Sequence, residues 1–319
     1  MKKTFILILT LCMAFCGIFA FGGCSPKADI TIGISKYVNI PALNDAEDGF
    51  IEEFNRLIKG AGKTVRYSQK EASGEQAQAN NIAGIMASQG VDLIYAIATP
   101  SAISAASATA DNKLPVVATA VTDFNSEKLL ENGNVTGTSD MNPIDKQYEL
   151  IKMLVPTVKK VGFLRMANEK NSIVQRDILK AYCDVDGVEL VDKSVTDRND
   201  IEAIFKQLSD CDVIYLPTDN TISNASPNIM NINKESIKKP IVWGEIGPHL
   251  VSGVATYGID YKELGKLSAK MAFDILINGK KPGDIPVQKL ENYKFSLNEE
   301  VANQIGFTIP DAVKALANK

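Results

Sequence analysis

Two short polar segments carry side chains that could bind the two ends of a small zwitterion. The first is Ala98-Thr99-Pro100-Ser101. Proline is favoured at the first helical position, which predicts Thr99 as the N-cap and Ser101 in the first turn, where hydroxyls and free N–H groups could hold a carboxylate. The second is Pro217-Thr218-Asp219-Asn220, whose acid and amide could bind an ammonium group. An ordinary capped helix and an Asx turn are the alternative interpretations.

Other polar side chains follow apolar runs and are further candidates for contact with a ligand. An aromatic ring at Tyr37 could stack on a flat molecule, although a partly exposed tyrosine needs no ligand to explain it. Asp140 and Asn142 could instead cap a helix that begins at Pro143, and the other acids could be solvated loop charges. These further candidates are Tyr37, Asn39, Thr122, Asp123, Asp140, Asn142 and Glu245.

Motifs for catalysis and for metal or nucleotide binding are missing from the sequence. His249 is the only histidine, and no GxSxG, HExxH, CxxC or GxGxxG pattern occurs. The run Gly60-Ala61-Gly62-Lys63-Thr64 departs from a phosphate-binding loop, because Leu57 stands where that pattern needs glycine. We therefore expect no cofactor, no metal and no enzymatic activity, although chemistry by carboxylates alone leaves no short motif.

The N-terminus has the order of an export signal: Lys2 and Lys3, an apolar stretch, and then Gly22-Gly23-Cys24. Small residues before a cysteine are typical of lipoproteins, so we expect residues 1–23 to be removed, Cys24 to be acylated and residues 24–29 to form a tether. Phe21 stands where leucine is usual, and a soluble secreted protein cut near Ala20 is the alternative. Loss of two lysines takes the formal net charge from −4 to −6, which argues against nucleic acid as a partner.

Three further side chains bear on the interior of the folded part. Cys183 and Cys211 are expected to be partly buried free thiols, although pairing depends on Cα separation and direction, which the sequence does not give. Trp243, the only tryptophan, ends an apolar run and is expected to pack in the core.

Short runs rich in valine and isoleucine alternate with longer stretches of helical period along the mature chain. This alternation predicts parallel sheets covered by helices. Capping boxes are predicted at Asn199 with Glu202 and at Asp260 with Glu263. The predicted strands are Ile30–Ile34, Thr64–Ser68, Leu93–Ile97, Val116–Ala120, Val161–Leu164, Glu189–Ser194, Val213–Leu216 and Ile241–Trp243.

The predicted strands form two sets that repeat each other. Ile32-Gly33-Ile34 corresponds to Val161-Gly162-Phe163 at an offset of 129 residues, and Asp92–Tyr95 corresponds to Asp212–Tyr215 at an offset of 120. The repeat predicts an α/β protein of two Rossmann-like lobes. Ligands of open α/β sheets bind beyond the carboxyl ends of the strands, so the candidate side chains would meet in a cleft between the lobes.

Three extended segments are predicted to connect the lobes as a three-strand hinge. They lie near Thr136–Asp140, Val254–Tyr257 and Val287–Glu291. Tyr257, in the second of them, completes the candidate ligand contacts. The predicted division is residues 30–138 plus 258–288 for lobe 1, and 139–257 plus 289–319 for lobe 2.

Five ordered motifs over nearly all of the mature chain resemble those of the tryptophan/tyrosine-type ABC transporter substrate-binding lipoproteins. They are Ala96–Ser101, Thr119–Asp123, Asn134–Asp140, Pro217–Asn220 and Ala255–Tyr261. The resemblance implies a type I periplasmic-binding-protein fold, a lipid anchor, a partner permease with an ATPase, and an aromatic amino acid as ligand, tyrosine or tryptophan first. It also implies that Thr99 and Ser101 hold the α-carboxylate, and that Asp219 and Asn220 hold the α-amino group.

Two other functions remain open at this point. A lipid-anchored chain at the cell surface could be an adhesin that contacts host cells. A receptor of the same fold could also bind another small solute such as a sugar, since fold alone does not fix the ligand. Under each hypothesis we expect an extracytoplasmic, surface-exposed monomer.

Overall fold

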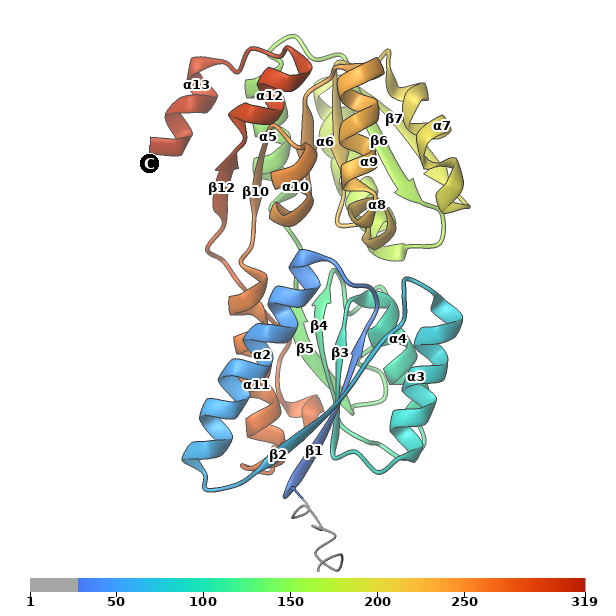
Figure 1. Ribbon diagram of the computed structural model, residues 1–319, viewed down its shortest axis with the longest axis vertical. Coiled ribbons are helices and arrows are strands. Elements are labelled where there is room, and N and C mark those ends of the chain that lie inside the picture. The colour runs from blue at the N-terminus through green and yellow to red at the C-terminus, as the bar shows by residue number, and fades with distance from the viewer. Residues whose placement is uncertain (1–27, 319) are drawn as a thin grey trace, which may run out of the picture.

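The computed structural model describes residues 28–318, which form two α/β lobes stacked one on the other (Figure 1). Lobe 1 contains a six-stranded parallel sheet in the order β11-β5-β4-β3-β1-β2. Helices α2 (Pro41–Gly60) and α11 (Tyr261–Leu276) pack together on one face, and α3 (Gln76–Ser88) and α4 (Thr99–Ala108) on the other. The strands are β1 (Ile30–Lys36), β2 (Val65–Glu71), β3 (Leu93–Ile97), β4 (Val116–Val121), β5 (Val135–Ser139) and β11 (Gln288–Lys289).

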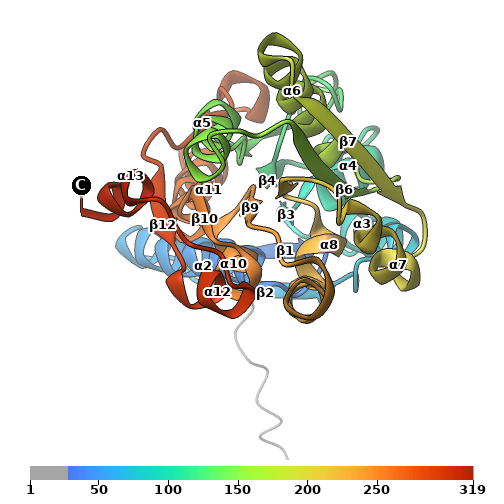
Figure 2. The same ribbon diagram turned by 90° about the horizontal axis from the view of Figure 1, so that it is seen from above.

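Lobe 2 contains a second six-stranded sheet, in the order β12-β10-β9-β8-β6-β7. Its strands are β6 (Lys160–Met166), β7 (Glu189–Val195), β8 (Val213–Leu216), β9 (Ile241–Trp243), β10 (Ala255–Gly258) and β12 (Lys294–Leu297). Its helices are α5 (Ile144–Leu154), α6 (Lys170–Asp186), α7 (Ile201–Phe205), α8 (Asn220–Asn224), α9 (Ser226–Ile232), α10 (Ile246–Ser252), α12 (Glu299–Ile305) and α13 (Asp311–Lys314). Seen from above, helices surround the stacked sheets (Figure 2).

The two sheets have the same topology. Each strand of lobe 1 has a counterpart at the same place in lobe 2, so that β1 corresponds to β6, β3 to β8 and β4 to β9. The outermost strands differ, because β11 runs parallel to β5 whereas β12 runs antiparallel to β10. The predicted repeat and the predicted fold class of two Rossmann-like α/β lobes are confirmed.

The chain passes between the lobes three times. The first passage follows β5, the second lies between β10 and α11, and the third lies between β11 and β12 (Figure 1). Three adjacent connections allow the lobes to bend relative to each other but restrict swivelling. The carboxyl ends of the parallel strands of both sheets point to the space between the lobes.

The strands form where continuous apolar runs can be buried on both faces. Every residue of β3, β4, β8 and β9 is buried, as expected for central strands of covered parallel sheets. The predicted bounds of β3, β8 and β9 are confirmed to the residue. The sequence-based bounds of β2 are less accurate, because this edge strand is mostly exposed and lacks an apolar run.

Two predicted helix caps are wrong and one is confirmed. Asp197, not Asn199, caps the short turn before α7, because its carboxylate accepts a hydrogen bond from the backbone of Asn199 (2.9 Å). Helix α4 begins at Thr99, so Ala98 takes the N-cap position that the proline predicts for Thr99. Asp260 caps α11 by accepting from the N–H groups of Lys262 and Glu263.

The interior side chains occupy the expected places. Cys183 and Cys211 are buried free thiols in two separate core clusters of lobe 2. Burial raises the pKa of each thiol to about 11. Trp243 is fully buried and donates to the Ser252 hydroxyl (2.9 Å), which confirms its core role. None of the helices in residues 28–318 is long and apolar enough to cross a membrane.

Candidate functional site

A small cavity of about 10 Å³, room for about one water molecule, lies between the closely packed lobes. Lobe 1 contributes side chains from the ends of its strands and from α2 and α11, and lobe 2 contributes the loops after β6, β8 and β9. Six of the ten lining residues carry polar groups other than a tyrosine hydroxyl, and all six are buried. The cavity is lined by Ile40, Leu43, Ala120, Thr122, Asp140, Asn171, Thr218, Asn220, Glu245 and Tyr261.

The first turn of α4 lies next to Thr122, a residue of lobe 1 that lines the cavity. Ala98, the N-cap, has φ 82° and ψ 153°, a conformation that is favourable only for glycine and that costs about 1–3 kcal/mol in other residues. Thr99 is buried, and its hydroxyl lies 3.5 Å from the Thr122 amide nitrogen, which donates to it. The Ser101 hydroxyl is fully buried and has no hydrogen-bond partner within the described part of the chain. A strained backbone and an unpaired hydroxyl at one helix start are typical of a ligand site.

Two buried carboxylates in lobe 2 have all their oxygens occupied. Asp219 accepts from the Met166 N–H (2.7 Å), the Ser172 hydroxyl (2.6 Å) and the Ile222 N–H (3.0 Å). Burial and the nearby Glu169 carboxylate raise the pKa of Asp219, while these three hydrogen bonds act in the opposite direction. Asp219 therefore caps α8 and holds the loop after β8, and it lies behind the cavity wall formed by its neighbours.

Glu169 is the second of these carboxylates, and the sequence analysis missed it. It lies in the loop after β6 and accepts from the backbone N–H groups of Asn220 (2.8 Å) and Thr221 (2.9 Å), and from three side-chain donors. The repeat could have indicated this residue, because its loop is the counterpart of the Lys36–Asn39 loop, which supplied ligand-contact candidates in lobe 1. Glu169 thus holds the loops after β6 and β8 together through these hydrogen bonds.

The other two buried carboxylates face the cavity and have fewer partners. Asp140 accepts from the Thr122 hydroxyl (3.1 Å) and the Tyr261 hydroxyl (2.9 Å). Glu245 accepts only from the Ser223 hydroxyl among the described residues. Burial raises the pKa of Asp140, and it raises the pKa of Glu245 to about 8.

Two amide oxygens close to the cavity also lack partners. Asn142 and Asn171 are both buried, and neither Oδ1 atom has a hydrogen-bond partner within residues 28–318. Buried polar atoms are almost always satisfied in folded proteins, so unpaired acceptors beside a cavity indicate a site for a donor-bearing ligand.

Of the predicted contact residues, only Thr122, Asp140, Asn220 and Glu245 line this cavity. Asp123 caps its own loop by accepting from the Asn125 and Ser126 N–H groups, and Tyr257 lines a separate surface pocket beside α5. Tyr37 is buried, donates to the Gly74 carbonyl (2.7 Å), and lines a second interlobe pocket near Arg198. Asn39 is exposed.

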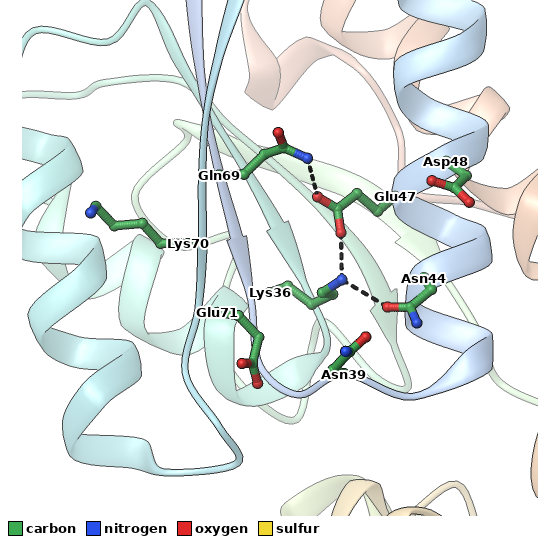
Figure 3. Close-up of a pocket in the computed structure, with 8 residues that line it drawn as sticks. All are labelled: Lys36, Asn39, Asn44, Glu47, Asp48, Gln69, Lys70 and Glu71. Carbon is green, nitrogen blue, oxygen red and sulfur yellow. Dashed lines mark hydrogen bonds and ion pairs between the residues drawn. The ribbon is translucent and has the colours of Figure 1, made fainter.

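Asn39 belongs to an open polar pocket within lobe 1 (Figure 3). In this pocket the Lys36 ammonium binds Glu47 (2.6 Å) and Asn44 (2.7 Å), and Gln69 donates to the other oxygen of Glu47 (2.8 Å). These groups satisfy one another, so the pocket is an open polar groove with an internal ion pair.

Besides the Lys294–Asp260 pair beside the connections (2.7 Å), two ion pairs connect the lobes at the edge of the interface. Lys170 at the start of α6 binds Glu127 of lobe 1 (3.0 Å), and Arg198 of lobe 2 binds Glu75 at the start of α3. The Arg198–Glu75 pair is exposed and contributes at most about 1 kcal/mol, whereas the Glu127 side chain of the other pair is buried. They can form only when the lobes are close together, so this structure represents a closed arrangement.

Comparison with known proteins agrees with this geometry. A family model described as ABC transporter substrate binding protein matches residues 31–319. A protein of Clostridioides difficile (strain R20291), named tyrosine-binding protein, is 36% identical over 280 residues, covering 86% of this chain and 80% of the relative.

Two solved structures of relatives, one ligand-bound and one open, allow the conformational state of this chain to be compared. A Streptococcus pneumoniae ABC domain in complex with L-Trp is 34% identical, covers 89% of this chain and 98% of its own, and superposes with a TM-score of 0.82. The ligand-free, open structure of a Clostridium difficile substrate-binding protein with adhesive properties is also 34% identical, covers 88% and 96%, and superposes with a TM-score of 0.66. At equal identity, the lobes of this chain are arranged more like those of the ligand-bound relative.

Proposed function

The chain belongs to the ABC transporter substrate-binding protein family, and on this premise we propose that it binds an aromatic amino acid, tyrosine or tryptophan first, between its lobes. The names of a relative and of a solved structure, tyrosine-binding protein and a complex with L-Trp, support this ligand class. The observation that carries the proposal is the buried interlobe cavity, in which hydroxyls, amides and carboxylates converge from both lobes.

The α-carboxylate of the ligand would bind at the first turn of α4. The unpaired Ser101 hydroxyl and the free N–H groups of this turn are donors, and the positive end of the helix dipole favours an anion there. Thr99 and Thr122 have hydroxyls on the same side of lobe 1. Of these residues only Thr122 lines the cavity itself.

The α-amino group would bind on the acidic side of the cavity. Asp140 and Glu245 line the cavity directly, and Asn220 and the unpaired Asn171 oxygen lie on the same wall. Asp219 would act indirectly, because its oxygens are already occupied and it holds the loop that presents Asn220. The apolar side chains of Ile40 and Leu43 would contact the aromatic ring.

Calorimetry of the ligand-stripped protein with the twenty amino acids tests the proposed function. We expect saturable heat with tyrosine or tryptophan and none with aryl acids that lack the amino group, because the acidic wall would then have no cation. The Ser101→Ala variant should bind the same ligand more weakly, by about ten- to a hundredfold, since one hydrogen bond to a charged group is lost. Absence of heat with tyrosine, tryptophan and phenylalanine would show that the ligand class is wrong.

Closing of the lobes connects ligand binding to transport. A ligand that contacts both lobes binds the closed form more tightly than the open form and so shifts the equilibrium toward it. The importer, made of a permease and an ATPase, would recognise this closed form, and the family's substrate-binding subunits work outside the cytoplasm. The cavity itself would bind without catalysing a reaction.

We also propose that Cys24 carries a lipid anchor and that the mature chain is a monomer held at the cell surface. Cys24 and the signal segment lie outside the described residues. The described chain begins at the far end of lobe 1 from the interlobe cavity (Figure 1), so an N-terminal tether would leave the cleft accessible. Metabolic labelling with a fatty acid checks this, because label should be lost in Cys24→Ala.

A further inference from the structure

The four buried carboxylates around the interlobe cavity differ in how well they are satisfied. Glu169 accepts from five donors and Asp219 from three. Asp140 accepts from two hydroxyls, and Glu245 from one. Glu245 is 3% exposed and lines the cavity, and its second oxygen has no hydrogen-bond donor among the described residues.

No cation in residues 28–318 pairs with any of these four carboxylates. The ion pairs of the two lobes all lie elsewhere. The groups facing Glu245 are Ser223 of α8, Tyr261 of α11, Asp140 after β5 and Glu169 before α6. They are hydroxyls or further acids, and both a buried site and a nearby like charge disfavour an ionised carboxylate.

We propose that Glu245 is a carboxylic acid in the ligand-free closed form, and that binding of the ligand's ammonium group makes it release its proton. This inference rests on the proposed function. The Glu245 COOH group and the ligand NH₃⁺ group become an ion pair of COO⁻ and NH₃⁺, and the proton passes to the buffer, so no heavy-atom bond forms or breaks. Binding would thus bring the positive charge of the ammonium group into the cavity while one proton leaves it.

The direction of the pKa shift agrees with this placement of the proton. Burial is the main cause that raises the pKa of Glu245 to about 8, and Asp140 and Glu169 add to it. A bound cation beside Glu245 lowers that pKa again. Affinity should therefore rise with pH from 6 to 8, by up to about tenfold per pH unit, and level off above the ligand-free pKa.

Calorimetry in two buffers measures the released proton. Tyrosine is titrated at pH 7 in phosphate and in Tris, which differ in ionisation enthalpy, and the difference in heat gives the number of protons. We expect about one proton released by the wild type and close to none by Glu245→Gln, whose affinity should be at least about tenfold lower at pH 8 and independent of pH. Glu235→Gln, an exposed change in the same lobe, is the matched control and should release the proton as the wild type does.

Infrared spectroscopy tests the same proposal without a ligand. The ligand-free protein at pH 7 should show a protonated-carboxyl band that loses intensity in Glu245→Gln, and this variant should keep its Tm at pH 7 because glutamine resembles the neutral acid. Equal heats in the two buffers, or a band of unchanged intensity in Glu245→Gln, overturn the inference. A wild type that shows the band but gives no heat with any aromatic amino acid would instead contradict the proposed ligand class.

Discussion

Gly265→Ala is expected to lower the free energy of unfolding by about 3 kcal/mol, at the upper end of the usual cost of overpacking. At Gly265 of α11 a β-carbon would lie 2.0 Å from the Ala46 carbonyl oxygen of α2. At Gly49 of α2 it would lie 2.1 Å from the Lys262 carbonyl oxygen of α11. The two helices thus cross in backbone contact, and any side chain at the crossing pushes them apart. Thermal unfolding should show a Tm lower by about 8 °C.

Gly84→Ala is the matched control for this prediction. Gly84 lies on the exposed face of α3, and a β-carbon there would meet nothing within 4 Å. Alanine at such a position should stabilise the helix by about 0.5–1 kcal/mol, because it loses less backbone entropy on folding. If Gly265→Ala were tolerated as well as Gly84→Ala, the helices would be further apart in solution than in the structure.

The Gly265 crossing also affects the interlobe site. Tyr261, at the start of α11, donates from its hydroxyl to the Asp140 carboxylate (2.9 Å) and lines the cavity. Displacement of α11 would move this hydroxyl away from Asp140 and from the first connection between the lobes. Residual folded Gly265→Ala protein should therefore bind ligand more weakly than the wild type, although no contact residue is changed.

Most of the fold could be predicted from the sequence because its signals are local. Apolar runs such as Leu93–Ile97 and Val213–Leu216 are buried on both faces, and their bounds follow from composition alone. The repeat offsets then predicted two lobes of like topology. The exposed edge strand β2 carries no such signal, because most of its side chains face solvent.

The site was harder to predict because its contacts are long-range. Sequence order indicated which loops follow the strands, and Thr122, Asp140, Asn220 and Glu245 do line one cavity. Sequence order could not show which carboxylates face that cavity and which accept hydrogen bonds from backbone N–H groups. Glu169 and Asp219 look like Asp140 and Glu245 in the sequence, and only the folded chain shows that backbone N–H groups from separate loops occupy them.

Asp219→Ala is the second large prediction, and it separates two possible roles of this carboxylate. The change leaves the N–H groups of Met166 and Ile222 and the hydroxyl of Ser172 buried without an acceptor. Each such group costs about 1–3 kcal/mol, so we expect a total loss of about 4 kcal/mol in the free energy of unfolding, since the terms are not additive. Affinity for the aromatic amino acid should fall at least about tenfold, because the loop that presents Asn220 is no longer held.

Denaturant unfolding and calorimetry on the same Asp219→Ala sample distinguish these roles. A direct counter-charge for the ligand would lose affinity with little loss of stability, whereas a cap that shapes the cavity wall loses both. Asn298→Ala is the matched control, because Asn298 caps α12 of the same lobe by accepting from the Val301 N–H (3.1 Å) and lies away from the cavity. Its removal should cost about 1 kcal/mol and leave affinity unchanged. Loss of affinity without loss of stability in Asp219→Ala would restore the role as ammonium partner that the sequence predicts, because the backbone amides would then not depend on this carboxylate.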